Sequence, residues 1–527
     1  MTHALFDDAI DEADLKRLAE LIALKAGSGD VIALRGDLGA GKTTFARALT
    51  QAISGSPDMD VPSPTFPIVQ IYETDRGTVA HYDWYRIVEP EELDELGIDE
   101  HLTGAVTLIE WPERAPDTLP PDHLRVALHE LTDQPDKRRV TLSATPQSAW
   151  ARRLERIVHI QRFLEDAIAS KTPDFGALAR ISYLTGDASP RAYARLFDDV
   201  GRTIVLMDAP AAIDGLHEYE ATSINPKTTT PLAYSKRAKL AEDIVPFLAV
   251  EQALSERNLL TPRVIATDLD KGLACLSDLG DEPFGRAVTV DPARQTELWR
   301  AAVDVLIKLR KSGPAPEQPI LTHGRSHTIP NLTSEILLHE TNLLLDWAAP
   351  TTLSSDAQAS FHATWAPLFD QALIDAGGWV LRDFHSPNLM WQDPAHEGER
   401  VGIIDFQDAL RGPWAYDLVS LLQDARVDVP PNLEAELMNV YCGAIAATEP
   451  SFDRVAFEQS YAILGAQRAS KVIGIFHRLN RRDGKSSYLA HLPRVEAALR
   501  RNLEKPVLEP VRAWFAQAIP GLLRSPT

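Results

Sequence analysis

The chain has 527 residues and a net charge of −22, with 53 Lys and Arg against 75 Asp and Glu. Hydrophobic residues make up 44% and charged residues 24%, a globular composition that excludes a wholly disordered, collagen-like or disulfide-scaffold protein. The length predicts about three domains. An acidic chain repels nucleic acid and anionic lipid overall, so any RNA contact needs a local patch or a partner protein.

Cysteines and apolar runs bear on the cellular location. The two cysteines, Cys275 and Cys442, fit a reducing compartment and have no metal-ligand spacing. The acidic N-terminus lacks a signal-peptide core, and no run approaches the roughly 18 apolar residues of a membrane span. We therefore expect a cytoplasmic protein with no membrane contact.

The first part of the chain has the pattern of an α/β domain over residues 1–148. A helix is predicted near Asp14–Lys25, and a second begins near Lys42 after a glycine-rich turn. Strands are predicted at Val31–Leu34, Pro67–Glu73, Val79–Asp83, Val106–Ile109, His123–Leu131 and Arg138–Ser143. We assign residues 149–157 to a linker at the start of a long helical pattern, Trp150–Ser170.

The remainder, residues 158–527, has the order of a two-lobed α+β domain. A strand-turn-strand pattern covers Ile181–Met207, and the sequence becomes helix-rich after about residue 285. Further strands are predicted around Trp379–Leu381 and Val401–Asp405, and residues 208–240 are predicted to form an irregular insertion with some helix.

A phosphate-binding loop is the first functional signal. Residues Gly36–Thr43 match G-x-x-x-x-G-K-[ST] between a predicted strand and a predicted helix, the context that this motif requires. Glycines let backbone N–H groups point at phosphate oxygens, and the helix adds its positive end. Lys42 would reach the β- and γ-phosphates of a nucleotide, and the Thr43 hydroxyl would bind Mg²⁺.

Two carboxylates follow later strands of the same domain. Asp83 ends one predicted strand, and Glu110 ends the next strong one. Carboxylates at strand ends fit ligand sites in open α/β sheets. Because a phosphate loop needs a metal ligand and a group that orients water, we interpret both as functional.

The segments GDLGAGKTTFAR (36–47), VPSPTF (61–66), HYDWYRI (81–87), EELDELGIDE (91–100) and LIEWPE (108–113) resemble the TsaE family over roughly residues 1–145. That family is the ATPase of the bacterial machinery that makes threonylcarbamoyladenosine in tRNA. The resemblance implies that Thr43 and Glu110 hold Mg²⁺, that Asp83 is a catalytic acidic residue and that Thr65 lies in a switch-like loop. It also implies a nucleotide site built from Glu12, Gly36, Gly39, Ala40, Gly41, Lys42, Thr43, Thr44 and Trp111.

The charge of this part bears on its partners. Residues 1–150 contain 13 Lys and Arg against 27 Asp and Glu, a net charge of −14. Such a surface disfavours direct tRNA binding. It agrees with the family expectation of a subunit that binds the threonylcarbamoyl-transferase complex and contacts tRNA only indirectly. The acidic stretch Glu89–Glu100 is either a solvated face or a docking surface.

A second signal has the spacing of a kinase catalytic loop. Asp383 and Asn388 form D-x-x-x-x-N after an apolar strand, and Asp405 follows a second strand. In kinases, the first Asp accepts or orients the substrate hydroxyl, while the Asn and the later Asp bind Mg²⁺. An isolated D-x-x-x-x-N is common, but the full set beside two strands is far more specific.

The wider pattern resembles the aminoglycoside phosphotransferase family within the protein-kinase-like fold. It is most similar to amino-sugar kinases of cell-wall recycling, which phosphorylate the anomeric hydroxyl of N-acetylmuramate and N-acetylglucosamine. The matching segments, spread over roughly residues 158–505, are LTGDASPRAYARL (184–196), VLMDAP (205–210), LSDLGD (276–281), LRDFHSPNLMW (381–391), IIDFQDALRGPWAYDLVSLLQDAR (403–426) and RASKVIGIFHRLNRRDGKSSYLAHLPRV (468–495).

This resemblance implies a nucleotide site that includes Gly186, Asp187 and Ser189 over the phosphates, with Asp278 and Gly280 at the hinge beside adenine. Asp417 would brace the catalytic loop. Two positions depart from kinases: the stretch 203–208 lacks the phosphate-pairing Lys, and Leu381 stands where a His is usual. Arg191 or Arg195 could supply the missing charge.

We therefore expect a fusion that uses ATP and Mg²⁺, with an ATPase domain and an amino-sugar kinase domain. The basic run of residues 468–485 is either a helical face or an attractor for an anionic sugar. Alternatives stay open: the second domain could phosphorylate choline or an aminoglycoside, or be a silent regulatory module. The first could be a generic nucleotide switch.

Overall fold

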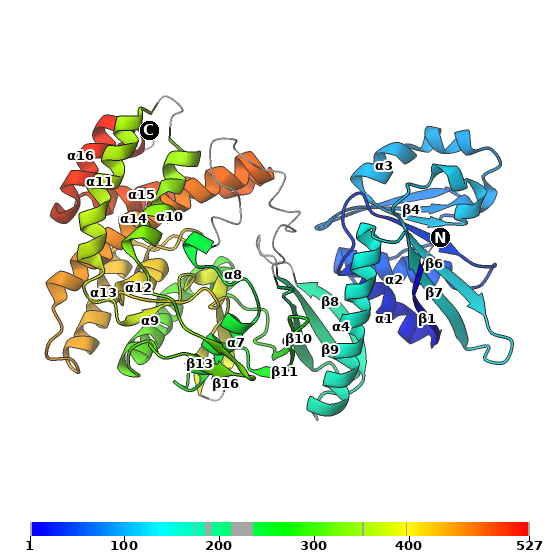
Figure 1. Cartoon of the computed structure of the whole chain (residues 1–527), viewed down its shortest axis with the longest axis horizontal. Coiled ribbons are helices and arrows are strands. Elements are labelled where there is room, and N and C mark those ends of the chain that lie inside the picture. The colour runs from blue at the N-terminus through cyan, green and yellow to red at the C-terminus, as the bar shows by residue number, and fades with distance from the viewer. Residues whose placement is uncertain are drawn as a thin grey trace. The chain divides into compact units, whose positions relative to one another are not determined.

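The computed structural model describes residues 3–172, 174–184, 191–211, 236–349, 353–396 and 398–524. The chain divides into two compact units (Figure 1). The first contains Met1–Pro210 and Val264–Asp278, and the second contains Ala211–Arg263 and Leu279–Thr527. No helix among these residues is both long and apolar enough to cross a membrane.

A mixed sheet with the strand order β1-β7-β6-β2-β5-β4-β3 organises residues 3–144. Its inner strands β6, β2, β5 and β4 run parallel, and antiparallel strands flank them at both edges. The inner strand β2 is apolar and buried, as expected for a parallel strand covered on both faces. The strands are β1 (His3–Asp11), β2 (Val31–Arg35), β3 (Val69–Thr74), β4 (Gly77–Asp83), β5 (Val106–Glu110), β6 (Leu124–Glu130) and β7 (Lys137–Ala144).

Three helices accompany this sheet: α1 (Glu12–Ala23), α2 (Lys42–Ser54) and α3 (Ile98–Gly104). The carboxylate of Asp11 accepts the backbone N–H of Asp14 at 2.8 Å and caps α1. Short 3-10 turns lie at η1 (Trp84–Arg86), η2 (Pro90–Leu96), η3 (Pro112–Arg114) and η4 (Pro116–Thr118). The α/β fold and the predicted strands are confirmed, whereas β1 was not predicted.

Helix α4 (Ala149–Lys171) follows β7 without an irregular linker. Residues 149–157 form its first turns because Trp150, Leu154 and Ile157 are buried. The Ser148 hydroxyl accepts the N–H of Ala151 at 3.1 Å and starts the helix. α4 packs against β1 and β7 on one side and against β11 and β12 of a second sheet on the other.

The second sheet of the first unit is antiparallel, with the order β11-β12-β10-β9-β8. One cluster of buried hydrophobic side chains continues from the first sheet through α4 into this second sheet; it includes Leu34, Phe45, Leu154, Leu196 and Cys275. The strands are β8 (Leu178–Leu184), β9 (Ala192–Asp198), β10 (Thr203–Asp208), β11 (Val264–Asp268) and β12 (Leu273–Ser277).

Polar contacts from α1 cover the edge strand β8. An edge strand presents backbone groups that no neighbouring strand pairs. The Glu20 carboxylate accepts the N–H of Ile181 at 2.8 Å, and Arg17 Nη1 donates to the carbonyl of Leu178 at 3.0 Å. At the end of β10, Asp208 forms ion pairs with Lys25 and with Arg156 of α4. These contacts join the phosphate-loop domain to the second sheet.

Burial at this seam raises the pKa of Glu20 to about 7, although the Ile181 N–H, Arg180 and Arg17 act in the opposite direction. In the unfolded chain this group ionises near its ordinary value of 4.5. Between pH 4.5 and about 7, Glu20 is ionised in the unfolded chain but still protonated in the folded one, which stabilises the unfolded state. The free energy of unfolding of the unit therefore falls as the pH rises through this range.

We expect Glu20→Gln to remove this loss, which amounts to about 1–2 kcal/mol after allowance for solvent screening. Differential scanning calorimetry of the full chain at pH 5 and pH 8 measures it as a smaller drop in Tm for the variant. The exposed Glu95 of η2 provides the control, because Glu95→Gln should leave the drop unchanged. Equal drops for the wild type and Glu20→Gln would contradict the expectation.

The second unit is mainly helical, and its helices gather into one body (Figure 1). The 30-residue helix α14 packs against α10, α11, α12 and α15. Gly474 allows α10 to approach, because a Cβ at this position would lie 2.3 Å from the backbone of Leu343. The helices are α7 (Val245–Ser255), α8 (Phe284–Val290), α9 (Gln295–Lys311), α10 (Ser334–Trp347), α11 (Ser355–Ala372), α12 (Ala415–Leu422), α13 (Pro431–Ala446), α14 (Arg454–Asp483), α15 (Leu492–Leu503) and α16 (Glu509–Ala518).

Among the described residues of the second unit, three short antiparallel strand pairs accompany the helices. They are β13 (Ile320–Thr322) with β14 (Arg325–His327), β15 (Gly378–Val380) with β18 (Leu410–Gly412), and β16 (Leu389–His396) with β17 (Glu399–Ile403). The strands predicted around Trp379–Leu381 and Val401–Asp405 correspond to β15 and β17. The predicted insertion at 208–240 falls mostly outside the described residues.

Candidate active sites

The phosphate loop connects the inner strand β2 to α2, as the motif predicts. Gly36 has a φ of 149°, and a Cβ there would lie 2.4 Å from the carbonyl oxygen of Leu128, so only glycine fits. Gly39, Ala40 and Gly41 complete the turn. Lys42, Thr43 and Thr44 occupy the first turn of α2, where backbone N–H groups are free for an anion.

Lys42 is buried and reaches back over the loop. Its Nζ donates to the carbonyl oxygens of Gly36 at 2.7 Å and Asp37 at 2.9 Å, and it lies 3.8 Å from the ring centre of Trp111. Burial lowers the pKa of this ammonium, and the carboxylates of Glu110 and Asp83 act in the opposite direction. The loop therefore holds a positive charge beside two acidic groups.

The two predicted carboxylates lie side by side. Asp83 and Glu110 are paired in register at the ends of the parallel strands β4 and β5. Glu110 Oε1 accepts the Thr43 hydroxyl at 2.8 Å, which brings together the two predicted metal ligands. Asp83 Oδ2 accepts the hydroxyl of Thr65 at 2.7 Å. Hydroxyl and carboxylate oxygens suit Mg²⁺, which usually keeps several waters and binds few protein groups.

His81 belongs to this cluster but was missed from the sequence. Its Nε2 lies 3.0 Å from Glu110 Oε1, and the side chain is fully buried. Two-residue alternation along β4 places His81 on the same face as Asp83, and this signal could have identified it. The Trp111 ring packs against Tyr85 in a tilted arrangement, with 5.0 Å between ring centres and 54° between ring planes. Glu12 lies exposed at the start of α1, where it pairs with Lys16 at 2.7 Å.

The kinase-like residues also converge, all within the second unit. The loop after β15 carries Asp383 and Asn388, and Asp405 follows β17. Asn388 Nδ2 donates to the Asp383 carbonyl at 3.0 Å and to Asp405 Oδ2 at 3.3 Å. Gln407 Nε2 donates to the other oxygen of Asp405 at 2.7 Å. The Asn388 side-chain oxygen and the Asp405 carboxylate are ligands of the type that Mg²⁺ prefers.

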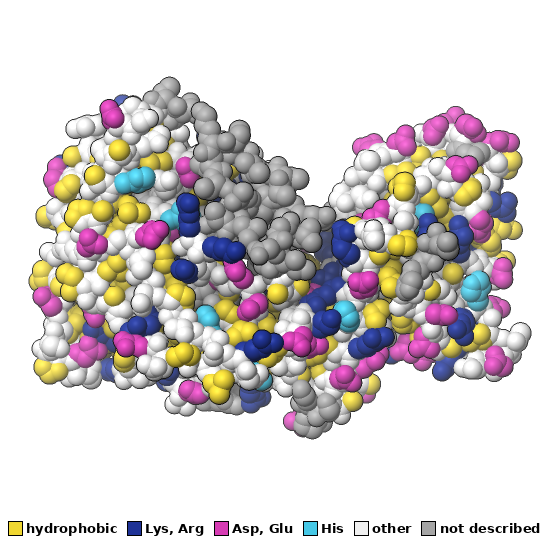
Figure 2. All heavy atoms as spheres, viewed as in Figure 1, with side chains coloured by type: hydrophobic (Ala, Val, Ile, Leu, Met, Phe, Trp, Pro, Cys, Tyr) yellow, Lys and Arg dark blue, Asp and Glu magenta, His cyan; other side chains and the backbone are white. Residues whose placement is uncertain are grey.

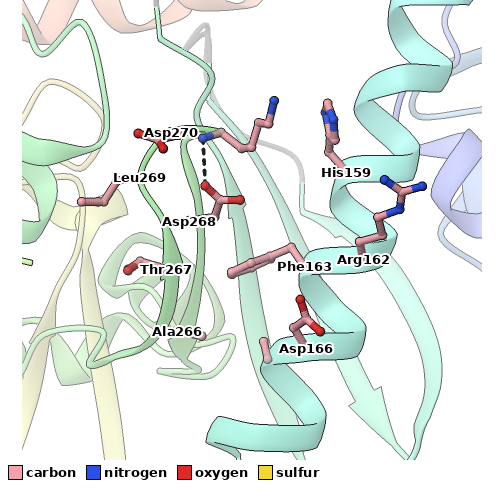
Figure 3. A pocket seen from close by; sticks show the side chains of 11 residues that line it. His159, Arg162, Phe163, Asp166, Ala266, Thr267, Asp268, Leu269 and Asp270 are labelled. Carbon is pink, nitrogen blue, oxygen red and sulfur yellow. Dashed lines mark hydrogen bonds between the residues drawn. The ribbon is translucent and has the colours of Figure 1, made fainter.

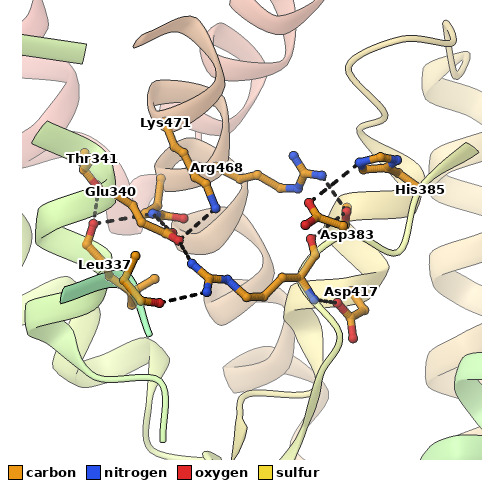
Figure 4. Close-up of polar contacts among 12 residues, drawn as sticks. Leu337, Glu340, Thr341, Asp383, His385, Asp417, Arg468 and Lys471 are labelled. Carbon is orange, nitrogen blue, oxygen red and sulfur yellow. Dashed lines mark hydrogen bonds and ion pairs between the residues drawn. The ribbon is translucent and has the colours of Figure 1, made fainter. Parts of the chain in front are cut away.

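Arg468, Lys471 and His385 lie near Asp383 (Figure 4), and His385 is neutral at pH 7 because its pKa is lowered to about 4. Burial would raise the pKa of Asp383, but His385, Lys471, Arg468 and Arg382 outweigh that effect and lower it. His385 Nε2 lies 3.8 Å from Asp383 Oδ1. Asp383 is therefore ionised at neutral pH, as a group that orients or accepts a hydroxyl proton requires.

The backbone of the catalytic loop is braced from α12. Asp417 accepts the N–H groups of Leu381 at 2.6 Å and Arg382 at 3.0 Å, which confirms its predicted bracing role. Arg382 has a φ of 69°, an unusual conformation for a residue with a Cβ. Its side chain is held by the carbonyl of Ala238 and by the fully buried Glu340 of α10.

Glu340 also accepts Lys471 Nζ at 2.8 Å and Gln467 Nε2 at 3.1 Å (Figure 4). Burial would raise its pKa, but Lys471 and Arg382 outweigh burial and lower it to about 2. Glu340 thus neutralises the buried Arg382 and the partly buried Lys471 behind the catalytic loop.

We expect Glu340→Gln to destabilise the second unit by about 3 kcal/mol or more, because it leaves buried cations without their counter-charge. Urea unfolding monitored by tryptophan fluorescence measures the change. The matched control is Glu335→Gln, at an exposed position one turn earlier on α10, where we expect less than about 0.5 kcal/mol. A loss below 1 kcal/mol for Glu340→Gln, on the order of a surface change, would contradict this interpretation.

The predicted nucleotide residues of the kinase domain lie partly outside the described part of the chain. Gly186, Asp187 and Ser189 fall in the stretch 185–190, which the structure does not describe. Asp278 follows β12 and binds Arg195 through contacts of 2.5 Å and 3.0 Å. Arg195 is therefore already paired. Gly280 has a φ of 82°, in the left-handed region.

A hollow of about 520 Å³ lies between α4 and the β11–β12 hairpin (Figure 3). Phe163 projects into it from α4, and Asp268 and Asp270 lie on the hairpin. None of the residues predicted for either site lines it. It also carries Arg162 and Lys271, so the charges on its wall are mixed and favour no ligand class.

A phosphate loop with a strand-end carboxylate pair, followed by a kinase-like catalytic loop, defines a chain with two phosphate-handling sites. Residues 9–140 match the family model "Threonylcarbamoyl adenosine biosynthesis protein TsaE", and residues 180–456 match "Phosphotransferase enzyme family". The chain belongs to the TsaE family in its N-terminal part and to the phosphotransferase enzyme family in its C-terminal part.

Curated relatives agree with both assignments. The chain is 34% identical over 357 residues to the N-acetylmuramate/N-acetylglucosamine kinase of Caulobacter vibrioides, covering 66% of this chain and 93% of the relative. It is 42% identical over 123 residues to the tRNA threonylcarbamoyladenosine biosynthesis protein TsaE of Rickettsia felis, and the match covers 23% of this chain and 71% of the relative. With the Rickettsia typhi protein of the same name it shares 43% identity over 120 residues, and the match covers 23% of this chain and 83% of the relative.

The chain is thus a fusion of a TsaE-like ATPase domain and a domain similar to N-acetylmuramate/N-acetylglucosamine kinases. Its fold combines a P-loop α/β domain with a protein-kinase-like phosphotransferase domain, as predicted. Both families use ATP.

Proposed function

We propose that the N-terminal domain, residues 1–148, hydrolyses Mg-ATP in support of threonylcarbamoyladenosine formation in tRNA. Lys42 binds the β- and γ-phosphates, and Thr43 and Glu110 bind Mg²⁺. Asp83 orients the attacking water, and Thr65 holds Asp83 through its hydroxyl. Trp111 lies beside the nucleotide, Glu12 on the side of the base, and the remaining loop residues cradle the phosphates.

In this proposal the domain acts on the threonylcarbamoyl-transferase complex and not directly on tRNA. Six acidic side chains of η2 and α3 are exposed: Glu91, Glu92, Asp94, Glu95, Asp99 and Glu100. Figure 2 shows acidic side chains gathered along the edge where α3 lies. This surface would repel the phosphates of RNA and attract a basic protein surface.

The C-terminal domain, which we place at residues 158–527 with 149–157 as its connection, transfers the γ-phosphoryl group of ATP to an amino sugar. The acceptor is the anomeric hydroxyl of N-acetylmuramate or N-acetylglucosamine. Asp383 orients the hydroxyl and accepts its proton, while Asn388 and Asp405 hold Mg²⁺, which neutralises charge on the phosphates. Gly186, Asp187, Ser189, Asp278 and Gly280 bind the nucleotide.

The observation that carries this proposal is the convergence of Asp383, Asn388 and Asp405, with cations that keep Asp383 ionised. Phosphorus NMR of the full chain with Mg-ATP and either sugar tests it. We expect an anomeric sugar phosphate, and no such signal from Asp383→Asn. No product from either sugar, with ATP still bound, would overturn the substrate. Parallel reactions with choline and an aminoglycoside then separate another alcohol kinase from a silent module.

A further inference from the structure

Positive charge concentrates at the C-terminal half of α14. Residues 468–485 contain six Lys and Arg and one acidic residue, Asp483, in a chain whose net charge is −22. The loop after α12 and the start of α15 add two more arginines. We define the basic rim as Arg426, Arg478, Arg481, Lys485 and Arg494.

The basic rim is assembled around aromatic side chains. Tyr488 and His491 pack against Phe476 of α14, with ring centres 5.5 Å and 5.9 Å away. The guanidinium of Arg426 lies 6.0 Å from the ring centre of Tyr488. Arg494 Nη1 donates to the carbonyl of Ala425 at 3.2 Å. The loop at 424–428 and the first turn of α15 are thereby fixed to α14.

The Arg426 end of the rim lies near the candidate catalytic loop. His385 is 3.8 Å from Asp383, and burial together with Arg468 and Arg426 lowers its pKa to about 4. His491 is held below its ordinary pKa by burial and by Arg494 and Arg426. Asp424 accepts the backbone N–H groups of both Ser386 and Arg426 at 2.7 Å, and this contact connects the rim to the catalytic loop that carries Asp383.

Carboxylates pair with part of this charge, since Arg494 Nε lies 3.7 Å from Asp428 Oδ1. Asp424 uses its oxygens to accept three backbone N–H groups, including that of Ser386 at 2.7 Å. Asp483 binds its neighbour Arg482. Arg481 and Lys485 form no side-chain hydrogen bond or ion pair with any residue that the structure describes. Within the rim, Arg481 and Lys485 thus keep positive charge available to a ligand.

We propose that the basic rim recognises a carboxylate on the sugar and thereby favours N-acetylmuramate over N-acetylglucosamine. The first carries a lactyl carboxylate and the second is neutral, while the rest of the two sugars is shared. This inference rests on the kinase function proposed above. A patch of one sign attracts an oppositely charged substrate and raises its rate of productive encounter.

Ionic strength separates the two sugars in one experiment on the full chain. Raising the salt from about 10 mM to about 150 mM shortens the Debye length from about 30 Å to about 8 Å. With Mg-ATP saturating, kcat/KM for N-acetylmuramate should fall about tenfold, and kcat/KM for N-acetylglucosamine by less than about twofold. Equal decreases in kcat/KM for both sugars would show that salt weakens an interaction with ATP and not with the sugar carboxylate, and this result would overturn the proposal.

Charge reversal locates the effect. The double variant Arg481→Glu, Lys485→Glu should lower kcat/KM for N-acetylmuramate at least about fivefold at low salt and leave N-acetylglucosamine within about twofold. Lys505→Glu is the matched control, because Lys505 is an exposed lysine beyond the far end of α15 and should change neither value.

The outcomes are distinguishable from failure of the kinase proposal. Activity with neither sugar, in the wild type, contradicts the proposed kinase itself. Activity with both sugars and an unchanged preference in the double variant contradicts only the role of the rim. Circular dichroism confirms that the variants are folded, and their activity with N-acetylglucosamine serves as a second check.

Discussion

Replacement of Asp383 by Asn should reduce kcat for sugar phosphorylation by about a hundredfold to ten-thousandfold, the range that a positioned base contributes. Asn keeps the shape of the side chain but cannot accept the hydroxyl proton. The cations around Asp383 then lose their counter-charge, so we expect KM for the sugar to change less than kcat. Steady-state assays of sugar phosphate formation at saturating Mg-ATP measure both constants.

The N-terminal site provides the internal control for Asp383→Asn. ATP hydrolysis that depends on the threonylcarbamoyl-transferase proteins should continue at the wild-type rate in this variant. If sugar phosphorylation remains within about threefold of the wild type, another group is the base and the assignment of Asp383 is wrong.

The second large effect concerns Glu110. Glu110→Gln removes the negative charge from the group that accepts the Thr43 hydroxyl and the His81 ring nitrogen. An amide oxygen binds Mg²⁺ more weakly than a carboxylate, so we expect ATP hydrolysis to fall about a hundredfold and to need more Mg²⁺ for half-saturation. Phosphate release assayed against Mg²⁺ concentration, with the partner proteins present, tests this.

Glu113→Gln is the matched control for Glu110→Gln. Glu113 is exposed and close enough to influence Lys42, but it makes no contact with Thr43. The loss of the Glu113 charge should change the rate of ATP hydrolysis by less than about threefold. Sugar phosphorylation should be unchanged in both variants. A Mg²⁺ requirement that Glu110→Gln leaves unaltered would show that the metal is held elsewhere.

Local patterns were sufficient to predict much of the first site. The phosphate loop is encoded by eight consecutive residues between a strand and a helix, so spacing alone defines its geometry. Asp83 and Glu110 are 27 positions apart, but parallel strand ends meet at one edge, and both were predicted. Strand β1 was not predicted because its adjacent acidic residues interrupt the alternation of apolar and polar residues that indicates an edge strand.

Contacts between distant parts of the chain could not be predicted in the same way. Glu340 binds Arg382 and Lys471, which lie 42 and 131 residues further along the chain, and no spacing rule connects them. The same holds for Glu20 and the N–H of Ile181, separated by 161 residues. The burial of Trp150, Leu154 and Ile157, which continue the core, likewise depends on partners that are distant in the sequence.

The seam between α1 and β8 determines how easily the two parts of the chain could be separated. A gene cut within α4 would remove a helix that belongs to both sheets and would expose the backbone of β8 that Glu20 and Arg17 cover. Exposed edge strands invite aggregation. Production of the two parts as separate chains would therefore require new surface residues on each. The seam therefore favours production of the two parts as one polypeptide.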